Sequence, residues 1–187
     1  MGQIYGTSLE TALDASRERY PARGTAYAGT TLVVDHRCRV LVNEHCNRRL
    51  AGQEHILVKA GPPTRGCANL AQDMRIFKGI ILIALGTVPP LRNGLRYKVV
   101  ELPTADKDYI VQNVNDRGDL VGEVFSINTE RMALSLRLSH AICYFSSQAR
   151  TITGDLRLAQ TSHPHFNIRH LVVGLGRAPE GHCVSVE

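Results

Sequence analysis

Thr30-Thr31-Leu32-Val33-Val34-Asp35 decides the fold class, because this stretch joins a strand to the start of a helix. Its apolar and β-branched residues pack well on a pleated, half-buried surface and therefore favour a strand. Asp35 is a residue type that caps helices, and we expect a helix over about 37–50 that Gly52 stops. A strand that leads directly into a helix is a building unit of mixed α/β domains. The stretch therefore predicts an α/β fold.

Further elements lie on both sides of this unit. A helix is predicted after the capping-box pattern Thr7-Ser8-Leu9-Glu10 and before Pro21. The strands predicted downstream are 56–58, the fully apolar 80–85, 97–102, 109–111, 121–125, 134–138 and 183–186, and another helix is predicted over 167–177. The strands between residues 97 and 125 are separated by turns that contain Asp and Gly, as in a small antiparallel module. An α/β domain interrupted by a β insert is the simplest architecture.

Composition limits the functions that the chain can have. Its 187 residues suffice for one core domain with a small insert. There are 22 Lys and Arg against 17 Asp and Glu, and the resulting net charge of +5 is compatible with a polyanionic partner. The five cysteines contain no CxxC pair, which is typical of a reducing compartment, and the longest apolar run, 79–85, is too short to cross a bilayer. We expect an intracellular protein, cytoplasmic or nuclear, that is neither secreted nor in a membrane.

Three other constellations point to chemistry only weakly. The glycine spacing over 24–31 is that of a phosphate-binding P-loop, but Thr30 stands in the lysine position and a strand follows instead of a helix. The histidines and cysteines around 36–46 and 163–170 lack ligand spacing, so we expect no metal site. Cys143 or a serine could be the nucleophile of a small hydrolase, although no GxSxG elbow is present. The hydrolase interpretation stays open without a motif in its favour.

Four segments occur in a distinctive order along the chain. They are Leu32-Val33-Val34-Asp35-His36-Arg37-Cys38-Arg39-Val40-Leu41-Val42-Asn43, then Arg92-Asn93-Gly94 followed by Tyr97-Lys98-Val99-Val100, then 136–152 with Phe145-Ser146-Ser147-Gln148-Ala149-Arg150-Thr151, and last His170-Leu171-Val172-Val173-Gly174-Leu175-Gly176-Arg177-Ala178. In this order they resemble parts of the second RecA-like motor domain of superfamily 1 DNA helicases of the RecD-like or PIF type. In the same order, the four segments resemble the strand and helix that open this domain, the entry to its SH3-like insert, the motif written HKSQG, and the last helicase motif, written YVALSRA. The resemblance covers nearly the whole chain.

Two of these segments depart from the family's pattern. Phe145 replaces the family's histidine, Ser147 its lysine, Ala149 its glycine and Gly176 its serine. Gln148 and Arg177, the positions most closely tied to chemistry, are retained. The departures fit a fragment, a split gene product or a degenerate relative that keeps the fold.

The resemblance implies a RecA-like, P-loop NTPase-type parallel sheet domain that lacks its own P-loop and is interrupted by a small antiparallel, SH3-like insert. Residues 1–94 would form the first part of the second RecA-like domain, 95–132 the insert, and 133–187 the remainder of the domain. The P-loop lysine and the Mg²⁺ ligands of such a motor belong to its first domain. ATP and Mg²⁺ would therefore bind only together with a missing N-terminal RecA-like domain, supplied in cis or in trans.

The resemblance also implies roles for single residues. Arg177 would act as an arginine finger and Gln148 as the nucleotide sensor, and these two are the expected catalytic residues. Arg39 is a further expected contact to the nucleotide. Single-stranded DNA would be contacted by His36, Arg37, Asn43, Ser146, Ser147 and Thr151, and no residue is expected to bind a metal.

The chain is thus expected to be the C-terminal motor portion of an ATP-dependent DNA helicase, of the kind that serves DNA repair or recombination, and to be inactive as an ATPase alone. The alternative is a non-catalytic module derived from a helicase, which binds nucleic acid or a protein partner. Weak, salt-sensitive DNA binding that ignores ATP would favour the module. A stand-alone hydrolase is the third interpretation, and it predicts a deep pocket around its nucleophile.

Overall fold

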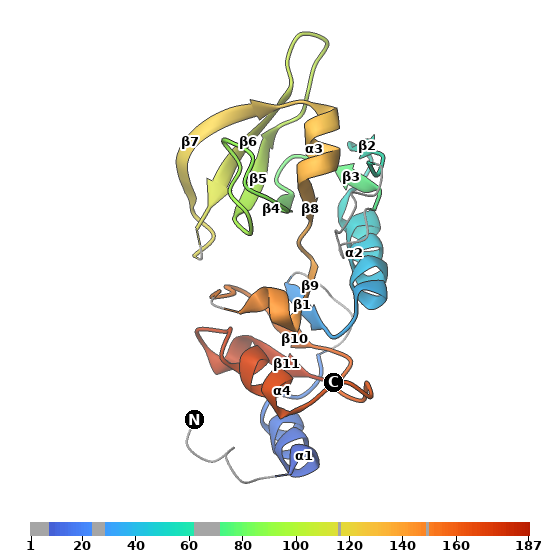
Figure 1. Cartoon of the computed structure of the whole chain (residues 1–187), viewed down its shortest axis with the longest axis vertical. Coiled ribbons are helices and arrows are strands. Elements are labelled where there is room, and N and C mark those ends of the chain that lie inside the picture. Colours follow the sequence, from blue (N-terminus) through green and yellow to red (C-terminus); the bar gives the residue numbers. More distant parts are fainter. Residues whose placement is uncertain (1–7, 24–28, 62–71, 116, 149) are drawn as a thin grey trace. The chain divides into compact units, whose positions relative to one another are not determined.

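The computed structural model describes residues 8–23, 29–61, 72–115, 117–148 and 150–187 (Figure 1). The chain divides into two compact units, one formed by Met1–Arg39 with Ala141–Glu187 and the other by Val40–His140. We call them the parallel unit and the antiparallel unit, after the larger sheet that each contains.

The parallel unit is organised around four short strands. They are β1 (Thr30–Val33), β9 (Ala141–Cys143), β10 (Leu156–Leu158) and β11 (Val184–Val186). Their order in space is β11-β10-β1-β9, and every neighbouring pair is parallel. Leu32 at the centre of β1 is aligned with Ile142 on one side and Leu158 on the other, and it is completely buried. Parallel strands of this kind are buried on both faces. The parallel sheet predicted from the sequence is confirmed.

Polar caps begin the helices at the places that the sequence predicts. The helices are α1 (Leu9–Arg19), α2 (His36–Leu50) and α4 (Ile168–Leu175), and two short 3-10 turns are η1 (Tyr144–Ser147) and η2 (Gly181–Cys183). Ser8, Asp35 and Asn167 precede the three helices, and a side-chain oxygen of each accepts a backbone N–H group from the first turn. Such caps satisfy backbone donors that have no partner inside the helix.

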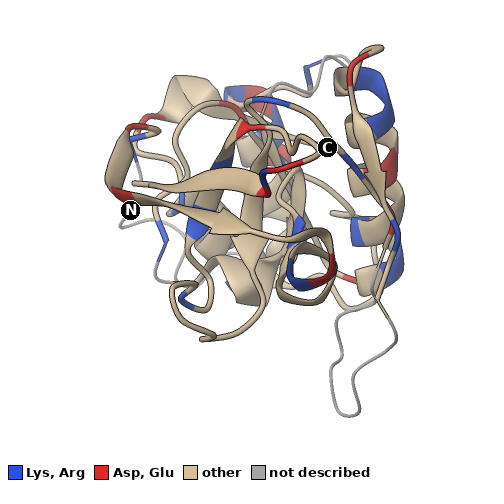
Figure 2. Ribbon diagram, turned by 90° about the horizontal axis from the view of Figure 1, so that it is seen from above, with Lys and Arg blue, Asp and Glu red and all other residues tan. Residues whose placement is uncertain are grey.

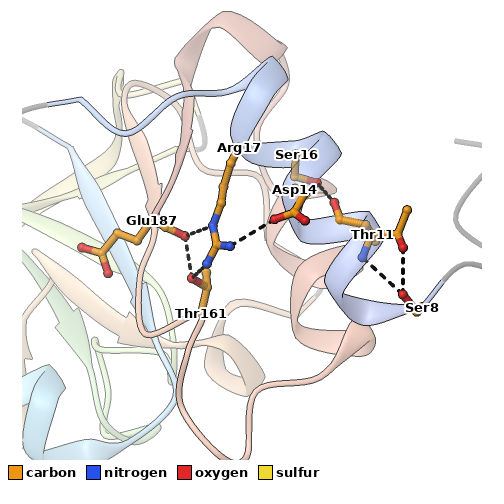
Figure 3. Close-up of polar contacts among 8 residues, drawn as sticks. Ser8, Thr11, Asp14, Ser16, Arg17, Thr161 and Glu187 are labelled. Carbon is orange, nitrogen blue, oxygen red and sulfur yellow. Dashed lines mark hydrogen bonds and ion pairs between the residues drawn. The ribbon is translucent and has the colours of Figure 1, made fainter.

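Arg17 attaches α1 to the end of the parallel sheet (Figure 3). Its Nε donates to the backbone carbonyl of Glu187 at 2.8 Å, and its Nη2 donates to Thr161 Oγ1 at 3.0 Å. The Thr161 hydroxyl donates to the same carbonyl of Glu187 at 2.5 Å. Asp14, one turn earlier on α1, accepts a longer bond from Arg17 Nη1 at 3.5 Å. One arginine thus joins α1 to the segments that follow β10 and β11.

The antiparallel unit contains two sheets and one helix. Its strands are β2 (Ile56–Val58), β3 (Met74–Ile76), β4 (Ile81–Ala84), β5 (Arg96–Glu101), β6 (Tyr109–Val114), β7 (Leu120–Ile127) and β8 (Leu136–Leu138), and its helix is α3 (Thr129–Ser135). The larger sheet has the order β7-β6-β5-β4-β8, and β2 pairs with β3 separately. All of these pairings are antiparallel. A single hydrophobic core lies between the two sheets and α3, with Leu82, Val99, Met132 and Leu138 completely buried.

Asn47 connects the later turns of α2 to this unit. Its side chain is 1% exposed, its Nδ2 donates to the backbone carbonyl of Arg75 at 2.8 Å, and its Oδ1 accepts the backbone N–H of Arg75 at 2.7 Å. The amide therefore pairs with β3 much as a neighbouring strand would.

The structure places one predicted strand within a sheet and replaces the start of another by a helix. The apolar run 80–85 forms β4, which lies between β5 and β8 in the antiparallel sheet. An apolar run predicts burial on both faces but not the direction of its neighbours. Leu134 is in α3 and 45% exposed, because Asn128 caps a helix that ends only where β8 begins. The candidate phosphate loop over 24–31 lies largely outside the described residues. The boundaries at 94 and 132 and the SH3-like character of the insert stay predictions.

Lys and Arg are interleaved with Asp and Glu along the ribbon (Figure 2). Among the helices, α2 carries the largest excess of positive charge, with four arginines against one glutamate. No helix within the described ranges combines the length and the apolar character needed to cross a membrane.

Candidate functional site

The carboxyl edge of the parallel sheet gathers loops that the sequence singles out. Because the strands run in one direction, the segments that follow β1, β9 and β10 all leave the sheet at this edge. Val33 at the end of β1 is aligned with Cys143 at the end of β9, so Asp35 and η1 follow from neighbouring positions. In open α/β sheets, ligands bind outside the carboxyl ends of the strands. This edge is therefore the first candidate surface.

Gln160 connects the ends of β1 and β10. Its Oε1 accepts the backbone N–H groups of Val34 at 2.8 Å and of Asp35 at 3.2 Å, and its Nε2 donates to the Asp35 carboxylate. The hydrogen bond from Gln160 is the main reason why the pKa of Asp35 lies below its usual value, so this group is a carboxylate at neutral pH. Gln160 has φ of 58°, in the left-handed region that side chains rarely adopt. No sequence motif marks such a glutamine, and sequence reasoning missed it.

The segment that begins at η1 exposes some of the predicted DNA contacts and buries another. Ser147 is completely buried, and its hydroxyl donates to a backbone carbonyl at the start of η1 at 2.7 Å. Ser146 is partly exposed, whereas Gln148 and Thr151 are exposed. Phe145, at the position of the family's histidine, is 68% exposed. Ser147 is therefore an internal residue and cannot contact DNA in this conformation.

The first turns of α2 show the same division. Arg37 is exposed, and His36 is partly exposed with its Nδ1 3.5 Å from Cys143 Sγ. Arg39 is 1% exposed and Asn43 is completely buried. Burial lowers the pKa of the Arg39 guanidinium from its ordinary value. Neither Arg39 nor Asn43 can touch a phosphate in this conformation.

Several hydrogen bonds hold Arg177 just after α4. Its Nε donates to the backbone carbonyl of Val173 at 3.1 Å, and its Nη1 donates to the carbonyl of Arg150 at 3.2 Å. The backbone carbonyl of Arg177 accepts the N–H of Ile152 at 2.8 Å. Arg177 as a whole is partly exposed. Arg177 and the segment before β10 are therefore one hydrogen-bonded structure.

Six of the nine predicted site residues reach the surface and three do not. Arg37, Gln148 and Thr151 are exposed, His36, Ser146 and Arg177 are partly exposed, and Arg39, Asn43 and Ser147 are buried. The structure brings Arg177 next to the segment that carries Gln148 and Thr151, and it brings His36 to the end of β9. Only the six can touch a ligand without rearrangement.

A hollow of about 560 Å³ opens at the carboxyl edge. It is lined by Val34, Asp35, Phe145, His163, Pro164, His165, Phe166, Asn167 and His170. His163 faces Asp35, with Nε2 and Oδ2 3.9 Å apart. Sequence reasoning considered these histidines only as metal ligands. In the described part of the chain, no three His, Cys, Asp or Glu side chains are grouped so that they could hold a metal ion.

Cys143, the candidate nucleophile of a hydrolase, is 5% exposed and does not line this hollow. Its sulfur lies near His36, but a nucleophile must also reach its substrate. The geometry gives no support to Cys143 as the nucleophile of a hydrolase.

Comparisons with known proteins identify the fold. No family model matches the sequence, and no curated protein matches it. The chain is similar to the crystal structure of Pif1 helicase from Candida albicans, with a TM-score of 0.62 and 16% identity over 95% of this chain and 49% of that chain. It is similar to Pif1 helicase from Bacteroides in complex with ADP-AlF3 and ssDNA, with a TM-score of 0.58 and 17% identity over 95% of this chain and 45% of that chain. Bacteroides Pif1 bound to ssDNA gives a TM-score of 0.60 and 16% identity over the same shares, 95% and 45%.

The chain spans about half the length of these helicases. Its parallel sheet and separate antiparallel sheet match a portion of a helicase with a RecA-like domain, which confirms the predicted fold class. At this level of identity the similarity concerns the fold alone, and function has to be argued from the site.

Proposed function

We propose that this chain is the C-terminal motor portion of an ATP-dependent DNA helicase, formed by the second RecA-like domain and an SH3-like insert over 95–132. It supplies Arg177 to the ATP site and binds single-stranded DNA at the carboxyl edge of the parallel sheet. An N-terminal RecA-like domain, in cis or in trans, supplies the P-loop lysine and the Mg²⁺ ligands. Alone, the chain does not hydrolyse ATP. Its place of action is the cytoplasm or the nucleus.

The observation that carries this proposal is the attachment of Arg177 to the segment before β10. A backbone bond of 2.8 Å from Ile152 and a side-chain bond of 3.2 Å to Arg150 join the two. A displacement of Arg177 therefore also shifts the segment that contains Gln148 and Thr151. A motor needs such a connection, because ATP turnover must change the affinity of the DNA-binding surface.

Arg177 has the chemistry of an arginine finger. A guanidinium is planar and always charged, and it stabilises the charge that develops on the oxygens of a transferred phosphoryl group. Bonds to two backbone carbonyls hold Nε and Nη1. We assign Nη2 to the γ-phosphate. Bound ATP would supply the phosphoryl group, and the Mg²⁺ bound with it would partly neutralise the charge of that group.

Exposed side chains at the carboxyl edge suit the backbone of a single strand. Arg37 offers a charged fork there, and the partly exposed Ser146 offers a neutral hydroxyl donor. Thr151, which lies between the two residues that bond to Arg177, offers a second hydroxyl at the other end of α4. At least half of the hydrogen bonds between proteins and DNA go to phosphates and sugars. Affinity should therefore fall with salt, since each neutralised phosphate releases counterions.

The proposal is tested by restoring the missing half. The full chain is joined to the N-terminal RecA-like domain of a Pif1 helicase, and ATP hydrolysis stimulated by single-stranded DNA is measured. We expect turnover by the joined protein and none by the chain alone. Arg177→Lys keeps a positive charge but loses the planar fork, and it should lower kcat by about 10³-fold. Arg117→Lys, in the exposed turn before β7, is the matched control and should leave kcat unchanged.

Two results would contradict the proposal. One is ATP hydrolysis by the chain alone, because no P-loop then needs to be supplied. The other is full activity of the joined Arg177→Lys protein. Thermal melting of that variant, followed by circular dichroism, distinguishes the loss of the finger from the loss of the fold.

A second candidate is a non-catalytic module, derived from a helicase, that binds nucleic acid or a protein. The burial of Ser147 and the apolar ring of Phe145 favour it, because neither presents the charged or polar group of the family at the surface. The two candidates differ in how DNA binding responds to nucleotide. The joined motor should change its affinity for an oligonucleotide when a non-hydrolysable ATP analogue binds, whereas a module should not.

A further inference from the structure

The size and the lining of the hollow at the carboxyl edge are not explained by the proposed phosphate contacts. Its volume of about 560 Å³ lies within the range of about 300–1,000 Å³ that is typical of small-molecule sites. Of the described residues that line it, none is a lysine or an arginine, and Asp35 contributes a carboxylate. A phosphate placed here would meet no lysine or arginine and would face a negative charge. A flat, neutral ring fits this lining better.

We propose that the hollow binds one nucleobase of single-stranded DNA, stacked against the ring of Phe145. This inference rests on the proposed function, because it specifies how one position of the bound strand is held. The base enters the hollow, while its sugar and phosphates stay on the rim.

Phe145 provides the stacking surface. Its ring is 68% exposed at the carboxyl end of β9, although large apolar side chains are usually buried. His170 contacts the Phe145 ring edge to face, with centroids 5.1 Å apart and planes at 72°. Proteins that bind single strands with little sequence preference stack successive bases on aromatic side chains of this kind.

A rigid set of rings lies behind Phe145. Phe166 and His170 are stacked, with centroids 5.5 Å apart and planes at 26°. Tyr144 meets both of them edge to face, at 5.5 Å and 5.3 Å. Its hydroxyl donates to the backbone carbonyl of Ala159 at 3.1 Å, which fixes the ring to the segment after β10. A preorganised wall loses little conformational freedom when a ligand binds.

One buried polar group at the hollow has no protein partner. His170 is 5% exposed, and its Nε2 makes no hydrogen bond to any described residue. The backbone N–H of Asn167 donates to Nδ1 at 3.2 Å, so the neutral ring carries its proton on Nε2. Burial also lowers the pKa of His170, which keeps the ring neutral near pH 7. This nitrogen is covered by its neighbours, so His170 contributes a neutral ring to the wall of the hollow and not a hydrogen bond to the base.

Two exposed arginines lie next to lining residues along the chain. Arg37 follows Asp35 by two positions, and Arg169 directly precedes His170. Exposed cations nearby in sequence and none in the lining suit a nucleotide, whose phosphate is anionic and whose base is neutral. The same distribution argues against an isolated anion in the hollow.

Fluorescence of 2-aminopurine tests the proposal. A strand that carries this base at alternate positions should lose fluorescence on binding to the wild-type chain and to Phe145→Tyr, which keeps an aromatic ring, but not on binding to Phe145→Leu. Fluorescence anisotropy should show that Phe145→Leu binds a base-bearing strand about tenfold more weakly than wild type. Its affinity for a strand of abasic sites should equal that of wild type. Leu134→Ala, at another exposed apolar side chain, is the control and should behave as wild type.

The outcomes separate this inference from the proposed function. If the wild-type chain binds base-bearing and abasic strands equally, or if Phe145→Leu quenches 2-aminopurine as wild type does, the base site is overturned while the backbone contacts remain. If wild type binds neither strand, both proposals are overturned. Circular dichroism of Phe145→Leu, compared with Phe145→Tyr, shows whether a weaker affinity comes from the ring or from unfolding.

Discussion

Lowering the pH from 7.5 to 5 should destabilise the antiparallel unit, because His140 is neutral in the folded chain. Burial lowers the pKa of His140 from its usual value of 6.5 to about 4. Its Nε2 is buried and makes no hydrogen bond to the described residues. A positive charge at this place would be poorly solvated, whereas in the unfolded chain water solvates it.

The magnitude follows from the two pKa values. Above about pH 6.5, His140 is neutral in both states and its contribution to stability is fully present. As the pH falls below 6.5, the unfolded chain binds a proton that the folded chain does not, so the free energy of unfolding decreases. One pH unit corresponds to about 1.4 kcal/mol. At pH 5, about 1.5 units below the unfolded value, the loss is about 2 kcal/mol, and it levels off below about pH 4.

Urea unfolding at the two pH values measures this effect. The chain has no tryptophan, so far-UV circular dichroism follows the transition. His140→Leu cannot titrate and should lose about 2 kcal/mol less than wild type between pH 7.5 and 5. If His140→Leu and wild type lose the same free energy, His140 is not a buried neutral group and the reasoning fails.

Two further substitutions test packing and hydrogen bonding. A Cβ atom at Gly174 would lie 2.6 Å from a methyl group of Leu158, so Gly174→Ala should cost about 1–3 kcal/mol of stability and lower Tm. Gly86→Ala is the control. A Cβ atom there would have no atom within 4 Å, so this variant should melt as wild type. Asn47→Ala would leave the backbone N–H and C=O of Arg75 without their partner and should lower the urea-derived free energy of unfolding by about 2 kcal/mol. An unchanged urea midpoint for Asn47→Ala would show that water replaces these bonds at no cost.

Local elements could be predicted from the sequence, because caps and residue patterns act over a few residues. Ser8, Asp35 and Asn167 mark the starts of three helices, and each accepts a backbone N–H in the structure. Sheet membership could not be predicted in the same way. β4 is as apolar as a parallel strand, and its pairing with β5 and β8 depends on residues distant in sequence. Hydrophobicity reports burial and carries no information on strand direction.

The candidate site was predictable only where a family motif marks it. The motif order pointed to Arg177 and Gln148, but it could not show that Arg39 and Ser147 are buried. Burial of a polar residue depends on which elements surround it, and a single sequence does not contain that information. Gln160 illustrates the opposite case, because its role depends on a left-handed backbone and on contacts to β1 that no pattern encodes.

The two proposed contact regions lie at opposite ends of α4. His170, in its first turn, lines the hollow, and Arg177 follows its last turn. The helix spans about 10 Å, and the missing side chain at Gly174 lets it lie directly on Leu158 of β10. A helix packed this closely moves as a rigid body. A phosphate that displaced Arg177 would therefore also shift the other end of the helix, at the base in the hollow. Hydrogen bonds to Val173, Arg150 and Ile152 hold Arg177 in place at this end of the helix.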